Sequence, residues 1–126
     1  MEEISVPANI TEIEDYTFSN CINLKSITLP EGLLSIGYSA FNTCSALEYI
    51  VIPSTVTSID EYAFAYCTKL STVLLFPITV PTISANTFPS LTIIRYYVED
   101  EVYESYKTAD VWSDISSQIR KLSEMV

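Results

Sequence analysis

Apolar residues recur along this chain with a 23-residue period. The stretch "TFSNCINLKSITLP" from Thr17 returns as "AFNTCSALEYIVIP" from Ala40 and as "AFAYCTKLSTVLLF" from Ala63. Such self-similarity at a fixed period predicts a repeat architecture. The columns in register are Ile13, Ile36 and Ile59; Phe18, Phe41 and Phe64; Cys21, Cys44 and Cys67; Leu24, Leu47, Leu70 and Ile93; Ile4, Ile27, Ile50, Val73 and Tyr96; Val6, Leu29, Ile52, Leu75 and Val98; and Pro7, Pro30 and Pro53.

The fourth unit departs from this period. Ile83 and Phe88 lie one residue late, whereas Ile93 and Tyr96 are again in phase. One residue is therefore inserted between Leu75 and Ile83, and one is removed between Phe88 and Ile93. The two prolines of "FPITVPTI" predict a modified loop at this point rather than a strand.

Each unit combines two patterns of apolar residues. In "LKSITLP", Ile27 and Leu29 alternate with polar residues, which predicts a short strand, and the following proline ends it. In "IEDYTFSNC", acidic residues precede Phe18 and Cys21, whose spacing predicts a short helix after a brief extended piece around Ile13. No single unit can bury its apolar side alone, so we expect neighbouring units to stack.

The pattern in "IGYSAFNTCSALEYIVIPSTVTSI" resembles the leucine-rich repeats of the BspA-like type, over roughly residues 4–98. The family occurs in surface proteins of host-associated bacteria and some protozoa. The resemblance implies an α/β repeat fold: a right-handed solenoid with one parallel sheet of about five strands. It also implies a non-enzymatic, secreted or cell-surface, adhesin-like module that contacts host extracellular matrix proteins, host cell-surface proteins or other microbes.

The tail of the chain is not repetitive. The stretch "YYVEDEVYESYKTADVWSDISSQI" resembles the segment that closes such domains, and Trp112, Ile115, Ile119 and Leu122 have the spacing of one helical face. We expect one structural domain in which residues 1–98 form the solenoid and residues 99–126 a helical C-terminal cap. The N-terminal edge has no such cap. We expect either that further repeats precede this edge or that the edge pairs with another molecule, as in a homodimer. The alternative function is therefore a structural spacer, or a self-assembly unit that acts through this open edge.

Composition narrows the classes of function. The 126 residues fit one domain, no apolar stretch approaches the length of a membrane span, and "MEEISVPANI" shows no export signal. The net charge of −10 argues against nucleic acid or an anionic membrane as partner, and favours a basic one.

Metal, cofactor and catalytic chemistry find little support. Zinc sites use closely spaced Cys and His, but this chain has no His and its thiols lie one full repeat apart. We expect three buried thiols, with Leu91 in the equivalent place of the fourth unit; a disulfide or a metal site is the alternative. We expect no enzyme, because the commonest general base is missing. Two carboxylate pairs at the predicted helix starts, Glu14–Asp15 and Asp60–Glu61, leave a carboxylate-based hydrolase as the remote alternative.

Two columns point outward from the predicted sheet. One contains Glu3, Ser26, Tyr49, Thr72 and Arg95, and the other Ser5, Thr28, Val51, Leu74 and Tyr97. Exposed apolar patches mark interaction surfaces, and Tyr and Arg are enriched in binding hot spots. The alternative is that such residues merely suit strands. Our candidate binding residues are Tyr49, Val51, Thr72, Leu74, Arg95 and Tyr97.

Overall fold

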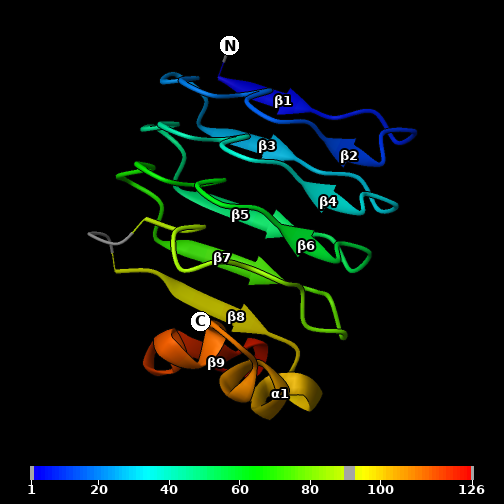
Figure 1. Cartoon of the computed structure of the whole chain (residues 1–126), viewed down its shortest axis with the longest axis vertical. Coiled ribbons are helices and arrows are strands. Elements are labelled where there is room, and N and C mark those ends of the chain that lie inside the picture. Colours follow the sequence, from blue (N-terminus) through cyan, green and yellow to red (C-terminus); the bar gives the residue numbers. More distant parts are fainter. Residues whose placement is uncertain (1, 90–92, 126) are drawn as a thin grey trace.

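The chain winds into a stack of rungs, each with a strand on the same side. The structure is a computed structural model that describes residues 2–89 and 93–125. Figure 1 shows the front strands one below another. These strands are β1 (Glu3–Ser5), β3 (Ser26–Thr28), β5 (Tyr49–Ile52), β7 (Thr72–Leu75) and β8 (Arg95–Val98). Pairing is parallel, and the partners are offset by one repeat, as in Glu3 with Ser26 and Thr72 with Arg95.

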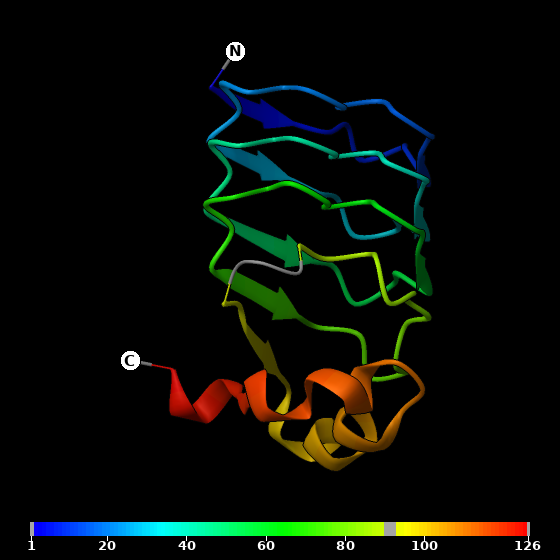
Figure 2. The ribbon, with the colours of Figure 1, turned by 60° about the vertical axis from the view of Figure 1, so that its left-hand side comes forward.

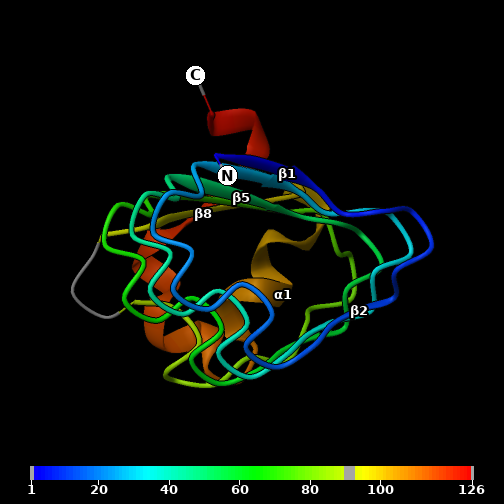
Figure 3. The same cartoon turned by 90° about the horizontal axis from the view of Figure 1, so that it is seen from above.

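A second set of strands forms the neighbouring side of the coil. It consists of β2 (Glu12–Ile13), β4 (Ser35–Ile36) and β6 (Ser58–Ile59), which pair in parallel. The front strands pair in two groups, β1–β3 and β5–β7–β8, and β9 (Ile119–Lys121) continues the second group. The expected single sheet of about five strands is therefore divided, and a second sheet accompanies it. Figure 3 looks along the stack and shows the rungs superimposed around a common interior.

The core fills this interior with the predicted columns. Stacked rings run through it, with centroids 5.3 Å apart for Phe18 and Phe41, 5.1 Å for Phe41 and Phe64, and 5.4 Å for Phe64 and Phe88. The leucine column is fully buried at Leu24, Leu47 and Leu70. Each rung thus covers the apolar side of its neighbour, as expected for a solenoid.

The expected short helix in each repeat is wrong, because the segments after β2, β4 and β6 are turns. Left-handed backbone recurs there every fourth residue, at Tyr16 and Asn20, Ser39 and Thr43, and Tyr62 and Tyr66. A right-handed helix cannot propagate through such residues. Alternate N–H groups instead donate to the next rung, as from Phe18 N to Ala40 O (2.8 Å) and from Phe41 N to Ala63 O (2.7 Å).

The fourth rung has the predicted one-residue shift, and the shift lasts longer than expected. Ser58 forms a bridge with Thr82 and Phe64 stacks on Phe88, and in both pairs the partner comes one residue later than the repeat predicts. Ile94 is 1% exposed, whereas Ile93 is 78% exposed. The prediction that Ile93 continues the leucine column is therefore wrong, because the extra residue is absorbed only between Ile94 and β8. Leu91, predicted in the cysteine column, lies outside the described residues.

The C-terminal segment lies across the end of the stack below β8, as Figure 2 shows. It contains η1 (Asp100–Val102), α1 (Tyr103–Thr108), η2 (Trp112–Gln118), β9 (Ile119–Lys121) and η3 (Leu122–Glu124). The expected helical face from Trp112 to Leu122 is wrong. Ile119 begins a strand and pairs with Tyr96, one full repeat earlier. No helix in the described residues is long and apolar enough to cross a bilayer.

Aromatic side chains join this segment to the fourth rung. Trp112 and Tyr106 are both buried and meet edge to face at 5.3 Å, and Trp112 also lies 6.1 Å from Phe88. The Trp112 Nε1–H donates to Pro81 O at 2.8 Å, and the Tyr106 hydroxyl donates to Pro77 O at 2.7 Å. The loop with the inserted residue therefore supplies the carbonyls that anchor the C-terminal segment.

Candidate functional site

The outward side of the front strands brings the six predicted candidate residues together on β5, β7 and β8. Tyr49 lies beside Thr72, and Thr72 beside Arg95. In the other column, Val51 lies beside Leu74, and Leu74 beside Tyr97. Parallel strands are ~4.8 Å apart, so three strands place these side chains on one patch about 10 Å deep along the stack. We call the outward side of β1, β3, β5, β7, β8 and β9 the front face.

The candidate residues are accessible to different degrees. Tyr49 is 46% exposed and Arg95 is exposed, whereas Val51, Thr72, Leu74 and Tyr97 are half-buried by their cross-strand neighbours. The front face is therefore partly apolar at β5 to β8. Its other end carries the small or charged side chains of Glu3, Ser5, Ser26 and Thr28.

Strand β9 extends the front face by one residue that the sequence reasoning missed. Arg120 pairs with Tyr97 and so continues the column of Val51 and Leu74. Its Nη1 donates to the carbonyls of Ser117 (2.5 Å) and Ile119 (3.1 Å). The missed signal was the period itself, because Arg120 follows Tyr97 by one full repeat.

Charge is distributed unevenly over this face. Arg95 and Arg120 are the two arginines of the chain, and both lie at the β8–β9 end. Among the described residues, an ion pair joins Lys25 Nζ to Glu2 Oε1 at 3.2 Å, and neither arginine takes part in it. Neither guanidinium is therefore neutralised by a carboxylate of the described chain.

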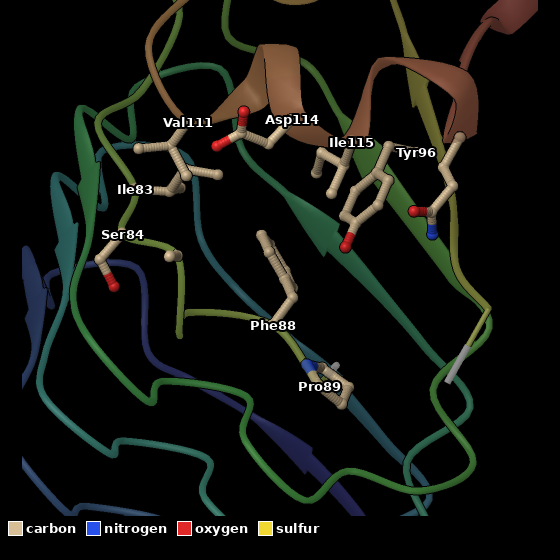
Figure 4. Close-up of a pocket in the computed structure, with 10 residues that line it drawn as sticks. Ile83, Ser84, Phe88, Pro89, Tyr96, Val111, Asp114 and Ile115 are labelled. Atoms are coloured by element: carbon tan, nitrogen blue, oxygen red, sulfur yellow. The ribbon is translucent and has the colours of Figure 1, made fainter. Parts of the chain in front are cut away.

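A cavity of about 220 Å³ lies between the fourth rung and the C-terminal segment, and Figure 4 shows the residues that line it. Phe88, Tyr96 and Ile115 form much of its apolar wall, and the Asp114 carboxylate lies at its edge. Burial raises the pKa of Tyr96. None of the six candidate residues is among the described residues that line this cavity.

The surroundings of the three cysteines indicate a structural role for this column. Cys44 and Cys67 are buried and their thiols donate to Phe18 O and Phe41 O, each at 3.2 Å. All three cysteines are free. The expectation of three buried thiols is wrong for Cys21, which is half-buried because only one neighbouring rung of the described chain covers it. The adjacent Cys44 thiol and burial raise the pKa of Cys67.

The two carboxylate pairs lie on exposed turns rather than at helix starts. An Asp15 Oδ1 accepts a hydrogen bond from Tyr38 N at 2.9 Å, and an Asp60 Oδ1 accepts one from Glu61 N at 2.7 Å. Both carboxylates thus stabilise turns. Among the described residues, no group of three or more Cys, Asp or Glu side chains is placed to hold a metal ion.

Comparison with known proteins identifies relatives of this architecture. A family model described as a BspA type leucine rich repeat region matches residues 1–109, with 6 copies. A crystal structure of a leucine-rich repeat protein from Bacteroides ovatus ATCC 8483 is similar with a TM-score of 0.73 and 23% sequence identity. That similarity covers 97% of this chain but only 30% of the other protein. No curated protein matches the sequence.

Proposed function

Because this chain belongs to the family of BspA-type leucine-rich repeat proteins, we propose that it is a protein-binding module that holds its partner on the front face. The observation that carries this proposal is the contiguous patch of Tyr49, Val51, Thr72, Leu74, Arg95 and Tyr97 on three neighbouring strands. Tyr and Arg dominate binding hot spots, because each combines a large contact area with directed hydrogen bonds.

The rigid backbone of the stack supports this function. The strands that carry the patch are paired, and their inward residues Ile50 and Val73 are fully buried. A surface fixed in this way loses little conformational freedom on binding, which favours affinity. Tyr49 and Tyr97 supply apolar contact, and the guanidinium of Arg95 can hold a partner carboxylate through two parallel hydrogen bonds.

We further propose that the module is non-enzymatic and belongs to a secreted or cell-surface adhesin-like protein of a microbe. Its partners would be host extracellular matrix proteins, host cell-surface proteins or surface proteins of other microbes. Membership of the family supports this assignment. This chain spans about 30% of the length of the structurally similar Bacteroides protein.

Residues 99–126 are, in this proposal, the C-terminal cap of a solenoid formed by residues 1–98, in one structural domain. Buried Trp112, Tyr106 and Ile119 support this division, because each covers apolar residues of the last rungs. The open apolar cross-section of a solenoid end needs such a cover.

The experiment is a binding comparison on immobilised collagen, laminin, fibronectin and fibrinogen. The test variant is Tyr49→Lys/Leu74→Lys, which places two charges in the patch. The matched control is Ser5→Lys/Thr28→Lys, which adds the same charges to exposed, paired positions at the other end of the front face. Equal melting temperatures establish that all three proteins are folded.

We expect the wild type and the control variant to bind at least one matrix protein, and the patch variant to lose that binding at least tenfold. Binding by a folded patch variant as tight as that of the wild type would move the contact to another surface. Failure of the wild type to bind any of the four proteins would contradict the proposed matrix-binding role.

A second candidate function is self-assembly through the N-terminal end of the stack. A groove of about 280 Å³ lies there, and its apolar lining includes Ile4, Val6, Ile10 and Phe18. Phe18 is only half-buried, whereas its equivalents Phe41 and Phe64 are fully buried. Sedimentation over a range of concentrations should show a dimer that Val6→Glu abolishes; a wild-type monomer throughout would exclude this function.

A further inference from the structure

Three tyrosines form a column on the turns that follow β2, β4 and β6. The ring centroids of Tyr16 and Tyr38 are 5.5 Å apart, and those of Tyr38 and Tyr62 are 5.8 Å apart, both edge to face. Tyr16 is 58% exposed, and the other two rings are half-buried. Figure 3 shows that these turns follow β2 around the coil, on the side away from the front strands. We call Tyr16, Tyr38 and Tyr62 the tyrosine ladder.

The backbone under the ladder is unfavourable for tyrosine. Tyr16 and Tyr62 have φ of 63° and 60°, a region in which a Cβ atom clashes and where Gly or Asn is preferred. In the second rung the left-handed position belongs to Ser39, yet Tyr38, one residue earlier, contacts both neighbouring rings. The column of rings therefore continues, although Tyr38 lies one residue earlier in its repeat than Tyr16 and Tyr62 do in theirs. Local backbone preference does not explain the column, because Gly or Asn rather than Tyr suits left-handed backbone.

The surroundings of the ladder are acidic in its first and third rungs. The segments 12–20, 35–43 and 58–66 contain Glu12, Glu14, Asp15, Asp60 and Glu61, and no Lys or Arg. All five carboxylates are on exposed residues. The pKa of Tyr38 is raised, first by burial and then by Tyr16, Tyr62 and Glu61. Glu61 directly precedes Tyr62 of the ladder in the chain.

We propose that the tyrosine ladder is a second binding surface, separate from the front face, for a basic Lys- or Arg-containing segment of a partner polypeptide. A guanidinium or ammonium group is attracted to the face of a tyrosine ring, and a guanidinium also stacks on it. The flanking carboxylates select positive charge and repel acidic segments. The chain's net charge of −10 adds to this preference.

The test uses fluorescence anisotropy with three labelled decamers at about 0.15 M salt, where long-range charge effects are screened beyond about 8 Å. One decamer alternates Gly with Arg, the second Gly with citrulline, and the third Gly with Glu. Citrulline has nearly the shape of Arg without its charge. We expect binding of the Arg decamer and at least tenfold weaker binding of the other two.

Tyr16→Asn/Tyr62→Asn removes two rings, keeps the net charge and places Asn where left-handed backbone suits it. We expect an unchanged or higher melting temperature and roughly tenfold weaker binding of the Arg decamer. Tyr66→Asn is the matched control, because Tyr66 is also exposed (66%) with φ of 61° but lies outside the ladder. It should bind like the wild type.

A second pair of variants separates the ladder from general charge attraction. Glu14→Gln/Glu61→Gln neutralises carboxylates beside the ladder and should weaken binding several-fold. Glu101→Gln/Glu104→Gln changes the net charge equally in the C-terminal segment and should leave binding within about twofold. The proposal is overturned if the Arg decamer does not bind, if the citrulline decamer binds equally, if the ladder variant binds like the wild type, or if both Gln pairs weaken binding alike.

Discussion

The regular rungs and the C-terminal end of the molecule bury their aromatic residues in opposite ways. In the rungs, Phe41 and Phe64 repeat one position and their rings are parallel to within 2°. At the C-terminal end, Tyr96 and Trp112 are perpendicular, at 90°, and come from different elements. The rungs rely on many similar contacts, whereas the C-terminal end relies on a few individual side chains.

Hydrogen bonding differs between the two regions in the same way. Successive rungs are joined by backbone groups, as from Phe41 N to Ala63 O. Besides the backbone pairing of β9 with β8, the C-terminal segment is joined to the fourth rung by side chains, through Trp112 to Pro81 O and Tyr106 to Pro77 O. Single substitutions should therefore be most damaging at the C-terminal end, where no equivalent neighbour repeats the contact.

The largest effect should come from Trp112→Ala. Removing this buried ring leaves a cavity beside Phe88 and Tyr96 and an unpaired Pro81 carbonyl, and should lower the free energy of unfolding by ~3–5 kcal/mol. Urea unfolding followed by circular dichroism measures it. Trp112→Phe, which keeps an aromatic ring, should lose less; a loss for Trp112→Ala below about 1 kcal/mol would contradict the anchoring role.

A neighbouring pair of isoleucines tests where the fourth rung regains its phase. Ile94→Ala should cost ~2–4 kcal/mol because this side chain is 1% exposed. Ile93→Ala, at a side chain 78% exposed, should change stability by less than about 0.5 kcal/mol. Thermal unfolding of both variants distinguishes them. A larger loss of stability for Ile93→Ala than for Ile94→Ala would show that Ile93, and not Ile94, continues the leucine column.

Tyr106→Phe isolates one of the two side-chain hydrogen bonds. It leaves the buried Pro77 carbonyl without its partner and should cost ~1–3 kcal/mol. Tyr103→Phe is the control, because its hydroxyl accepts a long 3.3 Å bond from Lys107 in a half-buried place. Equal unfolding midpoints for the two variants would show that the bond to Pro77 contributes nothing.

High pH should weaken both regions through groups held neutral in the fold. The pKa values of Cys67, Tyr96 and Tyr106 are raised in the folded protein. A raised pKa stabilises the fold below the ordinary value and the stability is lost as pH rises above it, here from about pH 9 for Cys67 and pH 10 for the tyrosines. Urea midpoints should fall between pH 8 and pH 11, and less steeply in Tyr106→Phe. A midpoint constant over this range would contradict the burial of these groups.

The sequence predicted the regions where one residue type repeats. The columns of Phe41 and Ile50 set the register of the rungs, and the same columns predicted the one-residue shift at Ile83 and Phe88. The outward patch from Tyr49 to Tyr97 followed from this register and strand alternation, although its binding role stays a prediction.

The remaining features depend on local conformation that the apolar pattern does not encode. Phe18 and Cys21 have helical spacing, but the left-handed Tyr16 and Asn20 turn the segment into a series of turns. Ile119 fits a helical face with Trp112 equally well as it fits the repeat period with Tyr96. Pairing with β8 decided between these patterns, and it placed Arg120 on the front face.

The most direct measurement is amide hydrogen exchange of residues 119–121 compared with that of β7 in the native protein. If β9 completes the sheet, its hydrogen-bonded amides should exchange slowly and with opening free energies approaching those of β7, and Trp112→Ala should lower the protection of β9 first. Exchange of all three β9 amides at the rates of an unfolded chain, with β7 still protected, would contradict a sheet that continues through β9 and remove Arg120 from the front face.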